Sequence, residues 1–82
     1  MVIKILGTGC PNCVRLKRAV VQVLEEVGVK ADVLEVKDVS GIMSYGIMST
    51  PGLVINERVR SYGRIPGHDE LALLIRAAMV ES

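Results

Sequence analysis

The sequence of 82 residues has no phenylalanine and no tryptophan, and its only aromatic side chains are Tyr45 and Tyr62. Proteins that bind single-stranded nucleic acids stack bases on aromatic side chains, and nucleic-acid binders in general present a strongly basic face. The formal net charge here is only +1. The composition therefore argues against a nucleic-acid partner. The core must be aliphatic, because 50% of the residues are hydrophobic but so few are aromatic.

No apolar run in the sequence is long enough for a membrane span. Lys4 interrupts the first apolar segment and Arg76 interrupts the last, whereas a spanning helix needs about 20 mostly apolar residues. The first segment is also too short for the apolar region of a secretory signal peptide. We therefore expect a monomeric cytoplasmic protein with no membrane partner, and the length predicts a single domain over residues 1–82.

Metal-ligating side chains are equally scarce, because the chain has two cysteines and one histidine. A structural zinc site is closed by four ligands, which one copy of this chain does not supply from these residues. We therefore expect no resident metal and no bound cofactor. In a cytosolic protein, a Cys-x-x-Cys pair is more typical of catalysis or metal binding than of a structural disulfide.

The two cysteines, Cys10 and Cys13, follow a short apolar run and precede an amphipathic one. Residues 2–6 are predicted to form a strand, the glycines after it a turn, and Pro11 the first residue of a helix, where its missing N–H needs no partner. Cys10 then lies at the helix N-terminus, where free N–H groups and the helix dipole favour a thiolate. Cys13 follows one turn later, close enough for a disulfide. The pattern predicts either a redox pair or a site that transfers a soft metal, copper(I) or zinc.

The remaining pattern predicts a small α/β domain. Apolar side chains recur at helical spacing after Pro11, and alternating or short apolar runs bounded by turn residues indicate strands. The predicted elements after the first strand are a helix over 11–28, a strand over 31–36, a short helix over 38–48, strands over 53–55 and 58–62 joined at Asn56-Glu57, and a helix from Asp69. The fold class is therefore β-α-β-α-β-β-α, with a four-stranded mixed sheet and helices on both faces.

Two of the predicted helices have apolar faces that can be named. The 38–48 helix should use Ile42, Met43, Tyr45, Ile47 and Met48, and the last helix should bury Leu71, Leu74, Ile75, Ala78 and Met79. Asp38 or Ser40 can cap the former helix, and its glycines weaken it by about 1 kcal/mol each relative to alanine. We therefore expect that helix to be short or frayed.

A Thr-Pro pair, Thr50-Pro51, stands directly before the apolar strand of residues 53–55 and about forty residues after the cysteines. With this pair, the whole chain resembles the thioredoxin superfamily in its smallest form, the small archaeal and bacterial glutaredoxin-like or thioredoxin-like redox-disulfide proteins. The resemblance is carried by three segments, IKILGTGCPNC over 3–13, YGIMSTPGLVIN over 45–56, and Gly63-Arg64. Its specificity comes from the combination, because each part alone is common.

The resemblance implies a thiol–disulfide oxidoreductase that passes two electrons between a flavoprotein reductase of the thioredoxin-reductase type and disulfide-containing protein substrates. Cys10 would be the attacking thiolate and Cys13 the resolving thiol. In that superfamily the proline corresponding to Pro51 is cis and packs beside the active-site disulfide. The substrate-binding residues would be Pro11, Thr50, Pro51 and Gly63. Thr50 would present its backbone N–H and C=O to an extended substrate segment, and Gly63 would keep the approach to the sulfurs open.

Several residues depart from the thioredoxin pattern. Gly9 stands where thioredoxins usually have tryptophan, Pro-Asn separates the cysteines in place of Gly-Pro, and the buried aspartate of thioredoxins has no clear equivalent. The cysteine loop is also similar to that of small copper chaperones, and residues 66–71 faintly resemble the glutathione-binding loop of glutaredoxins. A soft-metal transfer protein and a glutathione-dependent glutaredoxin therefore stay open as alternatives.

Overall fold

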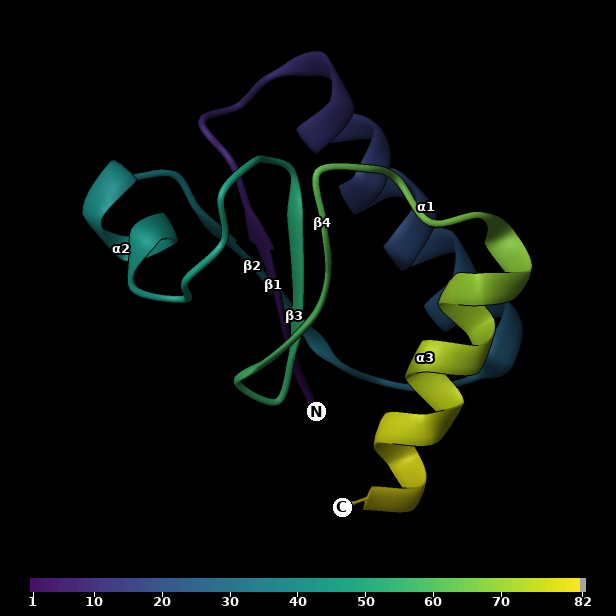
Figure 1. Cartoon of the computed structure of the whole chain (residues 1–82). Coiled ribbons are helices and arrows are strands. Elements are labelled where there is room, and N and C mark those ends of the chain that lie inside the picture. Colours follow the sequence, from purple (N-terminus) through teal and green to yellow (C-terminus); the bar gives the residue numbers. More distant parts are fainter. Residues whose placement is uncertain (82) are drawn as a thin grey trace.

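Figure 1 shows the computed structural model of the chain, which describes residues 1–81. Seven elements follow one another in the predicted order of strands and helices. They are β1 (Val2–Leu6), α1 (Pro11–Val27), β2 (Asp32–Val36), α2 (Val39–Met43), β3 (Gly52–Ile55), β4 (Arg58–Tyr62) and α3 (His68–Glu81).

The four strands form one mixed sheet in the order β2-β1-β3-β4. β1 runs parallel to β2 and antiparallel to β3, so both of its edges are hydrogen-bonded. β3 and β4 form an antiparallel hairpin whose turn residues, Asn56 and Glu57, both have positive φ, 51° and 67°. Positive φ at both central residues gives a turn whose twist matches that of the strands. The predicted two-residue hairpin is confirmed.

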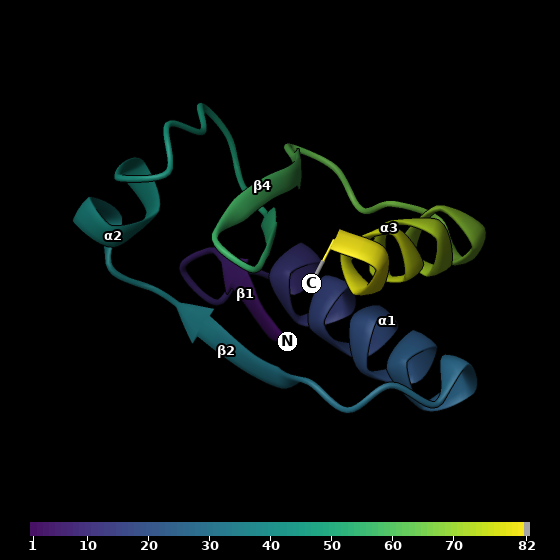
Figure 2. The ribbon, with the colours of Figure 1, turned by 90° about the horizontal axis from the view of Figure 1, so that it is seen from below.

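Helices cover both faces of the sheet, as predicted. α1 and α3 pack against each other on one face, and α2 lies on the opposite face (Figures 1 and 2). The face under α1 and α3 holds the larger core, Ile3, Ile5, Leu16, Val20, Val23, Leu24, Leu53, Ile55, Leu71, Ile75 and Ala78. The face under α2 holds a smaller one, Leu6, Ile42 and Val54, with Val36, Tyr45, Ile47 and Val59 packed against it.

The ends of α1 are set by the residues that the sequence indicated. Cys10 is the N-cap and Pro11 the first helical residue. Gly28 ends the helix in the left-handed conformation, with φ of 77°, and its N–H donates to the carbonyl of Leu24 at 3.0 Å. Glycine adopts this conformation without the penalty that a Cβ imposes. α1 therefore begins directly at the cysteine pair.

The expectation that the second helix is short is confirmed, since α2 spans only Val39–Met43 of the 38–48 range. Asp38 caps it, because its carboxylate accepts the N–H of Gly41 at 2.7 Å. Beyond Met43 the chain turns, and Gly46 takes a positive φ of 74°, which a helix does not allow. The apolar face predicted for this helix is wrong in part, since Tyr45, Ile47 and Met48 lie beyond its end and Met43 and Met48 are 66% and 91% exposed.

The buried face of α3 is narrower than predicted. Leu71, Ile75 and Ala78 are fully buried, but Met79 is 45% exposed. α3 packs on α1 along one stripe at spacings of four and three residues, and Met79 lies about 80° away from Leu71 around the helix. The prediction that Met79 is buried is therefore wrong.

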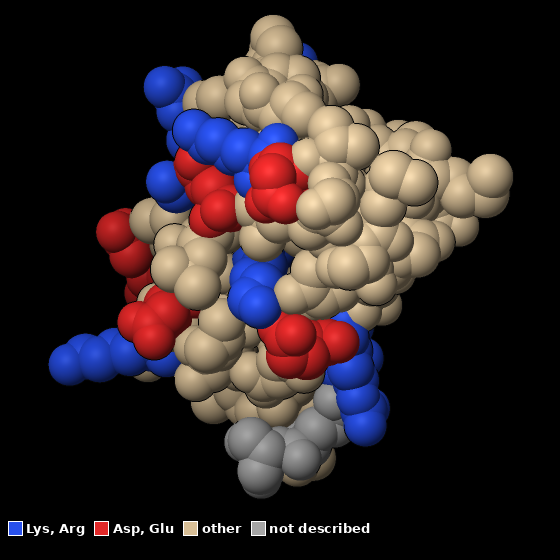
Figure 3. Space-filling view, turned by 90° about the vertical axis from the view of Figure 1, so that its left-hand side faces the viewer, with Lys and Arg blue, Asp and Glu red and all other residues tan. Residues whose placement is uncertain are grey.

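The surface on the side of α2 has no patch of a single charge. Figure 3 shows Lys and Arg side chains lying next to Asp and Glu side chains on the left and centre of this face, and a broad area without charges on its right. Of the helices in the described part of the chain, none has the length and apolarity that crossing a bilayer requires.

Candidate functional site

Cys10 and Cys13 form a disulfide in the turn that joins β1 to α1, with their Cα atoms 5.1 Å apart. The two sulfurs differ in their surroundings. Cys10 is partly exposed as the N-cap residue, whereas Cys13 is only 6% exposed and belongs to the buried face of α1. A reagent in solution therefore reaches the sulfur of Cys10 more readily than that of Cys13.

The backbone at the start of α1 points its N–H groups toward Cys10. The N–H of Cys13 donates to the Sγ of Cys10 at 3.3 Å and to its carbonyl oxygen at 3.0 Å. The N–H of Val14 donates to the same carbonyl at 3.1 Å. When the disulfide is reduced, a thiolate at Cys10 occupies the position that the helix dipole and the Cys13 N–H stabilise.

Gly7 holds the inner sulfur against the end of β1. Its N–H donates to the carbonyl of Val36 at 3.0 Å, which places it in line with the sheet. A Cβ at Gly7 would overlap the Sγ of Cys13. The sequence indicates Gly7 only as a turn residue and does not reveal this contact, because a glycine looks the same in a turn and in a close approach.

The Thr50–Pro51 pair lies across from Gly7. Leu6 pairs with Gly52 in the antiparallel ladder of β1 and β3, so Gly7, which follows β1, faces Pro51, which precedes β3. The Thr50–Pro51 peptide bond is cis. Pro51 is buried, Thr50 is exposed, and the Pro51 carbonyl accepts the N–H of Gly63 at 3.0 Å.

All of the predicted site residues therefore meet at one end of the sheet, where β1 ends. Pro11 is exposed next to Cys10. Gly63 follows β4 with a positive φ of 78° and lies beside Ser49, whose Oγ a side chain at Gly63 would overlap.

A family model described as "Thioredoxin domain" matches residues 1–76. The chain belongs to the thioredoxin domain family.

The curated relatives with similar sequences are archaeal thioredoxins. The chain is 29% identical to a thioredoxin of Methanothermobacter thermautotrophicus over 92% of this chain and 97% of the relative. It is 35% identical to a thioredoxin of Methanocaldococcus jannaschii, over 87% and 81% of the two chains. A probable thioredoxin of Archaeoglobus fulgidus is 37% identical, over 82% and 76%. The resemblance read from the sequence is confirmed, and with the Cys10–Cys13 disulfide it supports a protein-disulfide oxidoreductase.

The inner sulfur of this thioredoxin domain borders a charged cavity that the sequence did not indicate. The cavity has a volume of about 120 Å³ and is lined by Ile5, Gly7, Gly9, Cys13, Val14, Glu35 and Lys37. Glu35 lies there because β2 pairs it with Ile5. Its carboxylate lies 2.9 Å from the Nζ of Lys17 and 3.1 Å from that of Lys37, and both ammonium groups lower the pKa of Glu35.

Within residues 1–81, no three side chains of the His, Cys, Asp and Glu types are grouped as a metal site would group them. The two sulfurs are the soft ligands at this position.

Proposed function

We propose that this thioredoxin domain carries two electrons between a reductase and disulfide-containing protein substrates, using the Cys10–Cys13 dithiol and disulfide. The observation that supports it best is the asymmetry of the two sulfurs. The outer one lies at a helix N-terminus and accepts the N–H of Cys13, and the inner one is buried one turn later. Because the thiolate is the attacking form, the outer sulfur is suited to attack and the inner one to resolve.

The reaction then has two steps. The Cys10 thiolate attacks one sulfur of the substrate disulfide, forms a mixed disulfide, and releases the other substrate sulfur as a thiolate. Cys13 next loses its proton and attacks the Cys10 sulfur, which forms the Cys10–Cys13 disulfide and releases the second substrate sulfur. The substrate disulfide gains two electrons, the domain loses two, and the released substrate thiolates take up protons from solvent at neutral pH.

The substrate segment would lie along Thr50, with Pro51, Gly63 and Pro11 around it. Thr50 precedes β3 directly and is exposed, so its backbone groups can pair with an extended chain as a strand would. Met48, shortly before Thr50 in the sequence, and Tyr62, directly before Gly63, are 91% and 50% exposed and offer apolar contacts to a substrate.

The domain would be returned to its dithiol form by a flavoprotein reductase of the thioredoxin-reductase type in the cytoplasm. The two sulfurs carry both electrons, so the proposed cycle needs no bound cofactor. We propose that it acts as a monomer, because one copy of the chain contains both cysteines and the whole substrate-binding end.

Single-cysteine variants test the assigned roles. Cys13→Ser removes the resolving thiol, so it should accumulate a mixed disulfide with a model disulfide protein, detected by intact mass under non-reducing conditions. Cys10→Ser should accumulate far less, because its remaining sulfur is buried, and the variant without either cysteine is the control. Equal trapping by both single variants would contradict the order of attack.

The Cys13→Ser variant tests the glutathione alternative, and the wild-type domain, which has both thiols, tests the metal alternative. A glutathione-dependent protein would form its mixed disulfide with oxidised glutathione in preference to the model protein. A soft-metal transfer protein would retain copper(I) or zinc on its reduced dithiol while exchanging disulfides slowly. Either result would replace the proposed function.

A further inference from the structure

Residues 44–51, between α2 and β3, form a segment that is exposed at Met48, Ser49 and Thr50 and fixed on both sides of them. At one end the side chain of Ile47 packs in the smaller core, against Gly52, where an added Cβ would lie 2.8 Å from its Cδ1. At the other end the Pro51 carbonyl accepts the Gly63 N–H. Met48, Ser49 and Thr50 between these anchors are exposed. The arrangement of this short stretch therefore depends on how firmly its ends are held.

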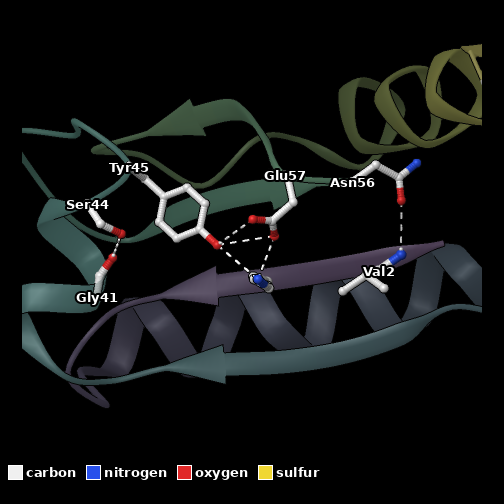
Figure 4. A network of polar contacts seen from close by, with 7 residues as sticks. Val2, Gly41, Ser44, Tyr45, Asn56 and Glu57 are labelled. Atoms are coloured by element: carbon white, nitrogen blue, oxygen red, sulfur yellow. Dashed lines mark hydrogen bonds and ion pairs between the residues drawn. The ribbon is translucent and has the colours of Figure 1, made fainter.

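The first end is also held by the hydroxyl group of Tyr45 (Figure 4). Lys4 Nζ donates to this hydroxyl at 2.9 Å, and the hydroxyl lies 3.2 and 3.3 Å from the two carboxylate oxygens of Glu57. Lys4 also forms an ion pair with Glu57, and its Nζ lies 5.7 Å from the centre of the Tyr45 ring. The three side chains thus join β1, the hairpin turn and the exposed segment.

The position of Lys4 makes this network unusual. Lys4 lies in the middle of β1, one of the two inner strands of the sheet, opposite Val54 of β3, and its side chain is only 23% exposed. A largely covered ammonium group is costly without partners. The β1–β3 ladder is made by backbone groups and does not require a charge here. The partners of Lys4 are Glu57 of the hairpin turn and Tyr45 of the segment between α2 and β3.

We propose that the Lys4–Glu57 pair positions residues 44–51 through the Tyr45 hydroxyl, and thereby sets the affinity of the domain for protein substrates. This inference rests on the proposed function, in which Thr50 pairs with a substrate segment. A segment already held in its binding arrangement loses less conformational freedom when the substrate binds. Lys4, Tyr45 and Glu57 are positioning residues, because they act through Thr50 and not on the sulfurs.

The first test compares two substrates in the variant Tyr45→Phe. This change keeps the ring and its packing and removes only the hydroxyl. These hydrogen bonds are largely exposed, so their loss should have the effect of an ordinary hydrogen bond and raise KM for a protein disulfide by about three- to tenfold, with kcat unchanged. Turnover of 5,5′-dithiobis(2-nitrobenzoic acid), which is too small to pair along the segment, should stay at the wild-type value.

The second test asks whether the residues act together. Glu57→Gln should raise the same KM, because it breaks the ion pair that holds Lys4 beside the hydroxyl. The double variant should be no worse than the stronger single variant, because both changes act through that one hydroxyl. Glu26→Gln is the matched control, since it removes a carboxylate from another exposed polar contact, that with His68 at the other end of α1. It should leave KM for the protein disulfide unchanged.

The outcomes separate this inference from the function on which it rests. A wild-type KM in Tyr45→Phe and in Glu57→Gln, with normal turnover of the protein disulfide, overturns the positioning role alone. If kcat for the small reagent falls in these variants, the substitutions have damaged the sulfur site, and the positioning role is also overturned. A wild-type domain that reduces the small reagent but no protein disulfide overturns both proposals.

Discussion

Replacing Gly7 with alanine tests how closely the inner sulfur is packed against the end of β1. An added Cβ would overlap the Sγ of Cys13 and lie 3.2 Å from its Cβ. The φ of Gly7 lies outside the left-handed region, so the backbone accepts alanine and the collision is the main effect. Inserting one methyl group into a well-packed site costs about 1–3 kcal/mol.

This cost should fall mainly on the oxidised form. In the disulfide, the Cys13 sulfur is bonded to Cys10 and cannot turn away from the added methyl group. In the dithiol, the Cys13 side chain is free to adopt another staggered rotamer. If the whole cost falls on the oxidised form, the reduction potential of the pair becomes less negative by about 20–65 mV, because 30 mV corresponds to about 1.4 kcal/mol for two electrons.

The potential is measured by equilibrating the protein with dithiol–disulfide buffers, alkylating the free thiols, and counting the adducts by intact mass. Thermal unfolding of both forms gives an independent value, since about 1 kcal/mol shifts the Tm of a domain of this size by about 4–8 °C. Gly67→Ala is the control, because a Cβ there meets no atom within 4 Å. A wild-type potential in Gly7→Ala, or an equal loss of Tm in both forms, would refute the reasoning.

Three further predictions concern the core, the cavity and pH. Ile75→Ala should lower the free energy of unfolding by about 2–5 kcal/mol, whereas Leu73→Ala, at a site that is 67% exposed, should change it by less than about 0.5 kcal/mol; urea denaturation checks both, and equal losses would contradict the assigned core. Glu35→Gln removes the carboxylate that lines the cavity beside Cys13 and leaves the ammonium groups of Lys17 and Lys37 without this partner, so alkylation of Cys13 in the reduced protein should become faster at neutral pH. A slower rate would argue against this electrostatic effect. Glu26 raises the pKa of His68 above its ordinary value of 6.5, so this contact stabilises the folded state fully below pH 6.5, and the stabilisation is lost as the pH rises through the raised pKa. The difference in Tm between the wild type and His68→Gln should therefore narrow with rising pH, and a difference that widens would contradict the direction of this pKa shift.

Most of the fold was predictable because its signals are local. The strands alternate or form short apolar runs, α1 has one continuous apolar stripe, and Gly28 and the pair Asn56-Glu57 supply the left-handed conformations that their turns require. The errors lie where local signals are weak. α2 is a single turn with a glycine inside it, and its predicted extension to Met48 followed apolar spacing across Gly46. Periodicity alone could not tell that α3 packs through so narrow a stripe.

The candidate site was predictable only in part, for the same physical reason. The cysteine pair and the Thr-Pro pair are motifs, so their residues could be named in advance. Lys4 and its partners are not a motif, because Tyr45 and Glu57 lie 41 and 53 residues away in the sequence. Their meeting depends on strand register, which places Lys4 on the face of α2 and Glu35 on the face of α1. A shift of one residue would exchange those faces.

The bonding of β1 on both edges has a consequence for local stability. The cysteines leave the end of a strand whose amides are hydrogen-bonded to neighbours on both sides, whereas residues 44–51 belong to no strand or helix. Amide hydrogen exchange should therefore be slowest in β1 and fast in residues 48–50, so the disulfide lies between a slowly exchanging strand and a rapidly exchanging segment. One side of the site would keep its shape through every redox cycle. The other side would keep its shape only as long as the side-chain contacts of Tyr45 and Ile47 hold it.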